Sequence, residues 1–234
     1  MKKIDVCLSP ELIQLYNLEK RVVVIVDVLR ASSTMVAALA NGIQAIRPFA
    51  SVPACMEMRR NGYLIAGERG GAIIDGFDLG NSPVSFLEEK YFGEKLAMTT
   101  TNGTLAIQLS SKADQIIIGS LINLQAVADY LKSQDRDVLV FCAGWKGKVN
   151  LEDTLFAGAL VEALEGHFES ECDAPIAAKA VYETAKSDIH GYLKNSSHVN
   201  RLRKLGIDKD IEFCLTPNQF DVVPELQGDD IVIP

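Results

Sequence analysis

The sequence predicts a three-layer α/β/α fold with a mostly parallel or mixed central sheet. From residue 20 to residue 165, short β-branched apolar runs alternate with longer amphipathic segments. The most apolar run, Arg21–Asp27, has polar residues only at its two ends. A run of this kind is typical of a strand buried on both faces, and alternation with helical segments indicates βαβ units.

Each apolar run predicts one strand, and each amphipathic segment predicts one helix. The predicted strands are Arg21–Asp27, Gln44–Pro48, Tyr63–Gly67, Leu96–Thr100, Gln115–Ser120 and Asp137–Ala143. The predicted helices are Ser33–Ala40, Pro53–Asn61, Pro83–Tyr91, Thr104–Ser110, Leu124–Ser133 and Leu151–Glu165. The pair Asn41-Gly42 suits a helix end, and Ser82 before Pro83 suits a helix start.

The last third of the chain differs from the rest in composition and in the order of its predicted elements. It contains an Ala-rich helical segment at Pro175–Ser187, a polar stretch with the basic run Arg201–Lys204, and a short terminal strand at Asp230–Pro234. The sequence contains no internal repeat and no low-complexity linker. We therefore expect a single α/β domain over residues 1–234, with a motif-bearing core at about 1–170 and a helical C-terminal elaboration at 171–234.

Composition limits the partners of this protein. The 234 residues are 48% hydrophobic and 23% charged, which is enough apolar material for a full core. The net charge of −8 argues against a nucleic-acid or membrane partner, although a local cluster of donors can still bind a small anion. Five widely spaced cysteines predict no disulfide framework, so we expect a cytoplasmic protein. The composition is also compatible with a homo-oligomer.

The residues that directly follow the predicted strands are unusually polar, and ligands of parallel α/β sheets bind at this edge. Asp27 ends the most apolar strand, Arg30 follows it, and the hydroxyls of Ser32, Ser33 and Thr34 open a helix. A helix N-terminus with hydroxyls and an arginine can bind phosphate or sulfonate oxygens. The alternative is that a serine only caps the helix while Asp27 pairs with Arg30.

Two more segments of this kind follow later strands. Glu68 and Arg69 lie among glycines at Gly67–Gly71, where the backbone can approach a ligand closely. The segment Thr99–Thr104 adds further candidate anion donors, namely Thr100, Thr101, Asn102 and Gly103. The alternatives are a solvated surface loop for the first segment and an ordinary strand-to-helix turn for the second.

Carboxylates from three separate post-strand segments suggest a magnesium site. They are Asp27, Glu68 and the pair Glu152-Asp153. Mg²⁺ prefers such oxygen ligands close to phosphate oxygens. An acidic pair in the first turn of a helix is also stabilised by the helix dipole whatever the function, so a purely structural role of Glu152 and Asp153 stays open.

Several other phosphate chemistries lack their residues. All three histidines, His167, His190 and His198, fall in the last third of the chain, outside the post-strand segments. No cysteine is followed by an arginine six places on, and Leu29 stands where a D-x-D motif beginning at Asp27 needs its second aspartate. The phosphate-binding loop G-x-x-x-x-G-K-[ST] is also missing.

Five ordered blocks together resemble the 2-phosphosulfolactate phosphatases. The blocks are VDVLRASST, AGERGG, FDLGNSP, TTTNGT, and CAG followed by LEDTLFAGAL. The resemblance implies a three-layer α/β protein that is a Mg²⁺-dependent phosphomonoester hydrolase. The implied substrate is (2R)-2-phospho-3-sulfolactate, which is cleaved to sulfolactate and phosphate in a route associated with coenzyme M biosynthesis.

Each candidate residue receives an expected role on this basis. Asp27, Glu68 and Asp153 are expected to hold Mg²⁺, and Asp27, Arg30 and Glu68 to act in catalysis. The expected anion donors are Arg30, Ser32, Ser33, Thr34, Arg69, Thr100, Thr101, Asn102 and Gly103. Two alternative functions use the same donors: a non-enzymatic sensor of a phosphorylated or sulfonated acid, and a phosphotransferase.

Overall fold

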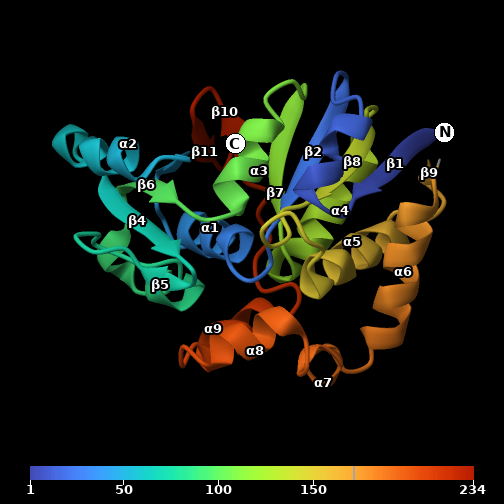
Figure 1. Cartoon of the computed structure of the whole chain (residues 1–234). Helices are drawn as coiled ribbons and strands as arrows, with labels where there is room; N and C mark the ends of the chain where they lie inside the picture. Colours follow the sequence, from blue (N-terminus) through green and yellow to red (C-terminus); the bar gives the residue numbers. More distant parts are fainter. Residues whose placement is uncertain (171) are drawn as a thin grey trace.

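The computed structural model describes residues 1–170 and 172–234, and these form a layered α/β/α structure around one mixed sheet (Figure 1). The described residues contribute eleven strands to the sheet, in the order β5-β4-β6-β3-β11-β10-β7-β2-β8-β1-β9. The predicted fold class is therefore confirmed. The predicted boundary at residue 171 lies outside the described residues.

The strands are β1 (Lys2–Cys7), β2 (Arg21–Val26), β3 (Ala45–Pro48), β4 (Leu64–Arg69), β5 (Ala72–Ile73), β6 (Lys95–Thr99), β7 (Gln115–Gly119), β8 (Asp137–Cys142), β9 (Phe168–Ser170), β10 (Glu225–Gln227) and β11 (Asp230–Val232).

Five of the predicted helical segments form helices of nearly the predicted length, Pro53–Asn61 is an α-helix only as far as Glu57, and Pro83–Tyr91 forms none. Beyond residue 188, three helices form that the sequence did not predict individually. The described residues form nine α-helices in all. They are α1 (Ala31–Ala40), α2 (Val52–Glu57), α3 (Gly103–Leu109), α4 (Leu124–Ser133), α5 (Leu151–Ala163), α6 (Asp173–Ala185), α7 (Ile189–Leu193), α8 (Ser197–Arg203) and α9 (Asp208–Cys214). The segment Pro83–Tyr91 forms two 3₁₀ turns instead of one helix. Pro83 and Phe86 are buried in the first of these turns, which contacts α1 and α9, so tertiary packing holds this segment.

The sheet consists of two parallel groups of strands that a C-terminal hairpin joins. One group is β4-β6-β3 and the other is β7-β2-β8-β1-β9. Between them, β11 pairs antiparallel with β3, and β10 pairs antiparallel with β7. The last strand of the chain thus lies in the middle of the sheet.

Strand β2 is covered on both faces, as its apolar sequence predicts. Val22, Val24 and Val26 belong to a core that includes residues of α4 and α5. Val23 and Ile25 point to the opposite face, into a core that includes residues of α1. Because successive side chains of a strand point to opposite faces, this division places helices on both sides of the sheet.

The segments after β2 and β6 meet where the strands end. Helix α1 is buried from Ala31 to Leu39, so it holds the segment after β2 firmly in the interior. A Cβ atom on Gly103 would lie 2.6 Å from the Cβ of Ala31 and 3.0 Å from Oδ2 of Asp27. Only a glycine lets the start of α3 approach Asp27 this closely.

The helices α7, α8 and α9 lie beside this same end of the sheet, below it in the view of Figure 1. Val199 and Leu202 of α8 are buried in the core that also contains Val28 and Leu29, which follow β2. Ser196 caps α8 by accepting a hydrogen bond from the backbone N–H of Val199 at 3.2 Å. In the part of the chain that the structure describes, no helix is long and apolar enough to cross a membrane.

Candidate active site

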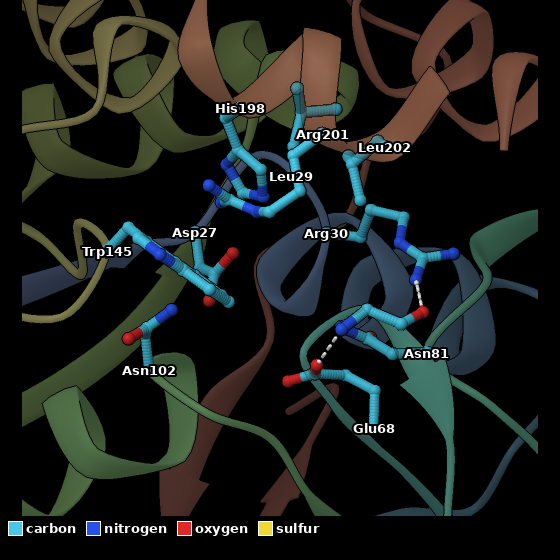
Figure 2. A pocket seen from close by; sticks show the side chains of 11 residues that line it. Asp27, Leu29, Arg30, Glu68, Asn81, Asn102, Trp145, His198, Arg201 and Leu202 are labelled. Carbon is cyan, nitrogen blue, oxygen red and sulfur yellow. Dashed lines mark hydrogen bonds between the residues drawn. The ribbon is translucent and has the colours of Figure 1, made fainter. Parts of the chain in front are cut away.

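A small polar pocket lies where the carboxyl ends of the strands meet the C-terminal helices (Figure 2). In Figure 2, Asp27, Asn102 and Glu68 approach it from the sheet, and His198, Arg201 and Leu202 approach it from α8 above. The residues lining it are Asp27, Leu29, Arg30, Glu68, Gly71, Asn81, Asn102, Trp145, His198, Arg201 and Leu202. Segments that are far apart in the sequence therefore supply one site.

Asp27 directly follows β2 and is almost completely buried, with 7% of its surface exposed. Its Oδ1 accepts a hydrogen bond from the backbone N–H of Ala31 at 3.3 Å, and its own N–H donates to Ser32 Oγ at 3.1 Å. The pKa of Asp27 is raised to about 6, mainly because the carboxyl is buried; His198 and the N–H of Ala31 act to lower it, and the charges of Glu68 and Glu152 act to raise it. This carboxylate is thus held close to other charged groups at the pocket.

Glu68, near the end of β4, connects two loops through its carboxylate. Oε2 accepts a hydrogen bond from the backbone N–H of Gly71 at 2.7 Å. Oε1 accepts one from the backbone N–H of Thr101 at 2.7 Å and another from its hydroxyl at 2.8 Å. These three hydrogen bonds fix the orientation of the carboxylate at the pocket.

Arg30 joins the pocket to the C-terminal part of the chain. Its guanidinium forms an ion pair with Asp210 of α9 and donates to the carbonyl of Gly71 at 3.0 Å. Ser82 donates its hydroxyl to the same Asp210 at 2.8 Å. A guanidinium has five N–H donors, so Arg30 can make these contacts and still bind an anion in the pocket.

His198 and Glu152 form a buried pair beside the pocket. Nδ1 of His198 lies 2.5 Å from Oε1 of Glu152 and 3.2 Å from the side-chain amide nitrogen of Asn150. The other carboxylate oxygen of Glu152, Oε2, is buried without a hydrogen-bond partner. Because Nδ1 is engaged, Nε2 is the ring nitrogen that is left to exchange a proton with a ligand.

Comparison with known proteins decides the family. A family model described as 2-phosphosulpholactate phosphatase matches residues 7–229. The chain belongs to this family. A relative from Thermotoga petrophila, named probable 2-phosphosulfolactate phosphatase, is 41% identical over 223 residues, which cover 95% of each chain. A relative of the same name from Caldanaerobacter subterraneus subsp. tengcongensis is 39% identical, over 91% of this chain and 90% of its own. Another from Clostridium perfringens strain SM101 is 36% identical, over 98% of this chain and 95% of its own.

In this member of the 2-phosphosulfolactate phosphatase family, four of the candidate residues from the sequence line the pocket. They are Asp27, Arg30, Glu68 and Asn102. Gly103 lies directly beside Asp27. Their segments follow different strands, and the convergence of the strand ends brings them together, as the sequence argument expects.

Asp153 is not among the residues that line the pocket. Its Oδ1 accepts a hydrogen bond from the backbone N–H of Val28 at 2.9 Å, and its Oδ2 accepts one from Gly144 at 3.1 Å. Burial, together with the nearby charges of Glu152 and Asp27, raises its pKa well above the ordinary value. The carboxylate of Asp153 thus connects the loops after β2 and β8.

Most of the candidate hydroxyls are bonded within the protein rather than exposed in the pocket. Ser33 Oγ donates to the carbonyl of Val28 at 2.7 Å, and Thr100 Oγ1 accepts from the backbone N–H of Thr104 at 3.2 Å. The hydroxyl of Thr34 is buried without a partner, outside the pocket lining. Arg69 is not part of the lining either, and it donates to Thr99 Oγ1 at 3.0 Å.

Sequence reasoning missed several pocket residues of this phosphatase family member, among them Asn81, His198 and Arg201. Asn81 lies in the FDLGNSP block, and Arg201 begins the basic run, but neither has a local pattern that points to a pocket. The sequence argument places His198 outside the site because this residue lies far along the chain. Only the packing of α8 against the end of the sheet brings it to Asp27.

The raised pKa of Asp27 predicts that this carboxylate destabilises the metal-free protein at neutral pH. Its pKa is about 6 in the folded protein and about 3.8 ordinarily, so the folded state binds the proton more tightly. Stability from this group is therefore present below pH 3.8 and is lost as pH rises through 6. A shift of two pKa units corresponds to roughly 3 kcal/mol.

With EDTA present, Asp27→Asn should unfold at higher denaturant concentration than the unmodified protein at about pH 7.5. This difference in denaturant midpoint should be smaller at about pH 5. If the difference in denaturant midpoint between Asp27→Asn and the unmodified protein grew as the pH fell, it would contradict a raised pKa of Asp27.

Proposed function

We propose that this protein hydrolyses 2-phosphosulfolactate to sulfolactate and phosphate. Its family and its relatives' names support a phosphoric monoester hydrolase of this specificity. The single observation that carries the proposal for this pocket is that Asp27 and Glu68, from separate segments of the sheet edge, face it together. Two carboxylates beside cationic side chains are suited to a phosphate ester bound with a divalent cation.

Mg²⁺ fits the residues at this pocket. Asp27 and Glu68 provide carboxylate oxygens, and Oδ1 of Asn81 is buried without a hydrogen-bond partner. Protein sites often hold Mg²⁺ through one or two carboxylates, with water and substrate oxygens as the remaining ligands. Among residues 1–170 and 172–234, no group of three or more His, Cys, Asp or Glu side chains is placed to hold a metal, so the proposal depends on Asp27 and Glu68 rather than on the three carboxylates expected from the sequence. When bound, the ion would neutralise charge on the phosphate.

The remaining expected roles are divided between binding and support. Arg30 and Asn102 face the pocket and are assigned to the phosphate oxygens. Asp153 is assigned to positioning, because it does not line the pocket and its carboxylate bonds the loops after β2 and β8. The hydroxyls that follow Asp27 and Thr99 are assigned to holding these loops in place. Hydrogen bonds that lock the groups around a site improve its geometry.

His198 is assigned as the proton donor to the leaving group. Hydrolysis breaks the bond between phosphorus and the ester oxygen while water adds to phosphorus, so the departing alkoxide must gain a proton. Glu152 holds Nδ1 of His198, which leaves Nε2 to give that proton and to recover one from water. Glu152 is a positioning residue in this scheme because it acts through His198.

Release of inorganic phosphate tests the proposal directly. With Mg²⁺ and 2-phosphosulfolactate, the purified protein should release phosphate and sulfolactate in equal amounts without a second substrate. Removal of divalent ions by EDTA should abolish the release, and added Mg²⁺ should restore it. Binding without phosphate release would favour the sensor, and release that requires an acceptor alcohol would favour the phosphotransferase. Full activity after exhaustive chelation would exclude the metal site.

A further inference from the structure

Arg201 reaches the pocket from α8, and its guanidinium lies over an aromatic ring. Its Cζ is 3.7 Å from the ring centroid of Trp145, which follows β8. The ring of His198, three residues earlier on α8, lies 5.7 Å from the same tryptophan. Stacking of this kind holds a planar guanidinium in one orientation and leaves its edge free for hydrogen bonds.

The guanidinium of Arg201 has a donor without a partner. Nη2 is buried and forms no hydrogen bond within the described structure. By contrast, Arg30, the other arginine that lines the pocket, is paired with Asp210. A buried N–H group that is left unbonded is costly, and more so on a charged group. Glu152 and Glu68 lie close enough to act on the charge of Arg201, yet neither bonds Nη2, so this donor is available to an anionic ligand.

The position of Arg201 indicates which part of a substrate it meets. Residues three apart on a helix lie on the same face, so Arg201 is next to His198, the assigned proton donor. The oxygen that receives this proton is attached to the carbon that carries the carboxylate and the sulfonate-bearing methylene group. The same oxygen is also bonded to phosphorus, but Arg30 and Asn102 of the pocket are assigned to the phosphate oxygens, which leaves Arg201 for these acid groups.

We propose that Arg201, seated on Trp145, binds the acid end of the substrate and makes the site selective for phosphate esters of 2-hydroxy acids. This inference rests on the function proposed above and adds the residue that sets the substrate class. A guanidinium suits the task because its two parallel N–H groups match two oxygens of a carboxylate or a sulfonate. Trp145 is a positioning residue, since its ring lies directly under the guanidinium and supports it.

The experiment compares substrates that differ at the acid end. Glycerol 2-phosphate has a secondary alkoxide leaving group like that of 2-phosphosulfolactate but carries no acid. Arg201→Gln should lower the ratio of kcat/KM for 2-phosphosulfolactate to kcat/KM for glycerol 2-phosphate by roughly ten- to a hundred-fold. Arg203→Gln is the matched control, because Arg203 lies on the same helix outside the pocket and should leave the ratio unchanged. An unchanged ratio in Arg201→Gln would overturn the inference.

A third substrate identifies the acid group. 2-Phospholactate has the carboxylate and lacks the sulfonate. If Arg201→Gln also lowers the ratio of kcat/KM for 2-phospholactate to kcat/KM for glycerol 2-phosphate, Arg201 binds the carboxylate. If the variant lowers kcat/KM selectively for 2-phosphosulfolactate alone, Arg201 binds the sulfonate. Both results support the inference. Arg201→Lys keeps the charge but loses the paired donors, so it should show a smaller selective loss and serves if Arg201→Gln does not fold.

A binding measurement separates this inference from the proposed function. Sulfolactate, the product without phosphate, can be titrated calorimetrically into the protein with no turnover. The unmodified protein and Arg203→Gln should bind it with equal affinity, and Arg201→Gln should bind it at least roughly ten-fold more weakly. If the unmodified protein releases no phosphate yet shows this pattern, the proposed function fails and the inference stands. If phosphate is released but binding does not depend on Arg201, the inference fails alone.

Discussion

Asp27→Asn is expected to lower kcat/KM for 2-phosphosulfolactate by about a thousand-fold or more. Asp27 is buried at the end of the central strand β2 and faces the pocket together with Glu68. Replacing its carboxylate by an amide removes the charged ligand that we propose for the metal ion, and a bound metal ion contributes several kcal/mol to stabilising a phosphoryl transition state. At about 1.4 kcal/mol for each factor of ten, this is roughly a thousand-fold. Steady-state phosphate release measures the loss.

The same variant should remain folded, so lost activity can be separated from lost structure. Asp129→Asn is the control, because Asp129 is an exposed carboxylate on α4 that bonds Gln125 and Lys132. It should keep the activity of the unmodified protein. Circular dichroism and the denaturant midpoint establish folding for both variants. Activity of Asp27→Asn within about ten-fold of the unmodified protein would remove Asp27 from the chemistry.

His198→Gln is expected to slow turnover of 2-phosphosulfolactate by roughly a hundred- to ten-thousand-fold, the usual range for a general acid. The alkoxide of a 2-hydroxy acid is a poor leaving group and needs a proton. p-Nitrophenolate leaves without one, so the loss of kcat on p-nitrophenyl phosphate should be at least about ten-fold smaller. The pH profile for 2-phosphosulfolactate should also lose the limb that reports the protonated acid.

Two further variants test the environment of His198. Glu152→Gln should reproduce part of the loss, because Glu152 bonds Nδ1 and orients the ring. His190→Gln is the control, since His190 lies on α7 outside the pocket and should retain activity on both esters. Equal losses on both esters in His198→Gln would mean that His198 only supports the fold.

Both predictions depend on a site that the C-terminal helices complete. Arg30 is paired with Asp210 of α9, and His198 and Arg201 descend from α8 (Figure 2). The C-terminal elaboration therefore closes the pocket above the sheet. Its buried residues Val199, Leu202 and Ile211 share a core with β2, which holds these pocket side chains in place relative to Asp27.

By itself, the sequence determined six of the eight parallel strands in the described part of the chain, all except β1 and β9, and the polar segments at their carboxyl ends. An apolar strand such as Arg21–Val26 can be recognised locally, because burial on both faces leaves no room for polar residues. Parallel strand ends meet at one edge, so the convergence of Asp27, Glu68 and Asn102 follows from the order of strands and polar segments along the chain.

Only the tertiary structure decided which of these residues face the pocket and what joins them from elsewhere. His198 and Glu152 are 46 residues apart, and Arg30 and Asp210 are 180 apart, so no local pattern links them. The hairpin β10–β11, which is inserted between β3 and β7, is equally hidden, since pairing of distant strands leaves little local trace. Asp153 and Glu152 are adjacent in the sequence, yet one bonds two backbone N–H groups and the other bonds a histidine. Neighbouring side chains on a helix point in different directions, and what each one meets depends on the packing of the whole chain.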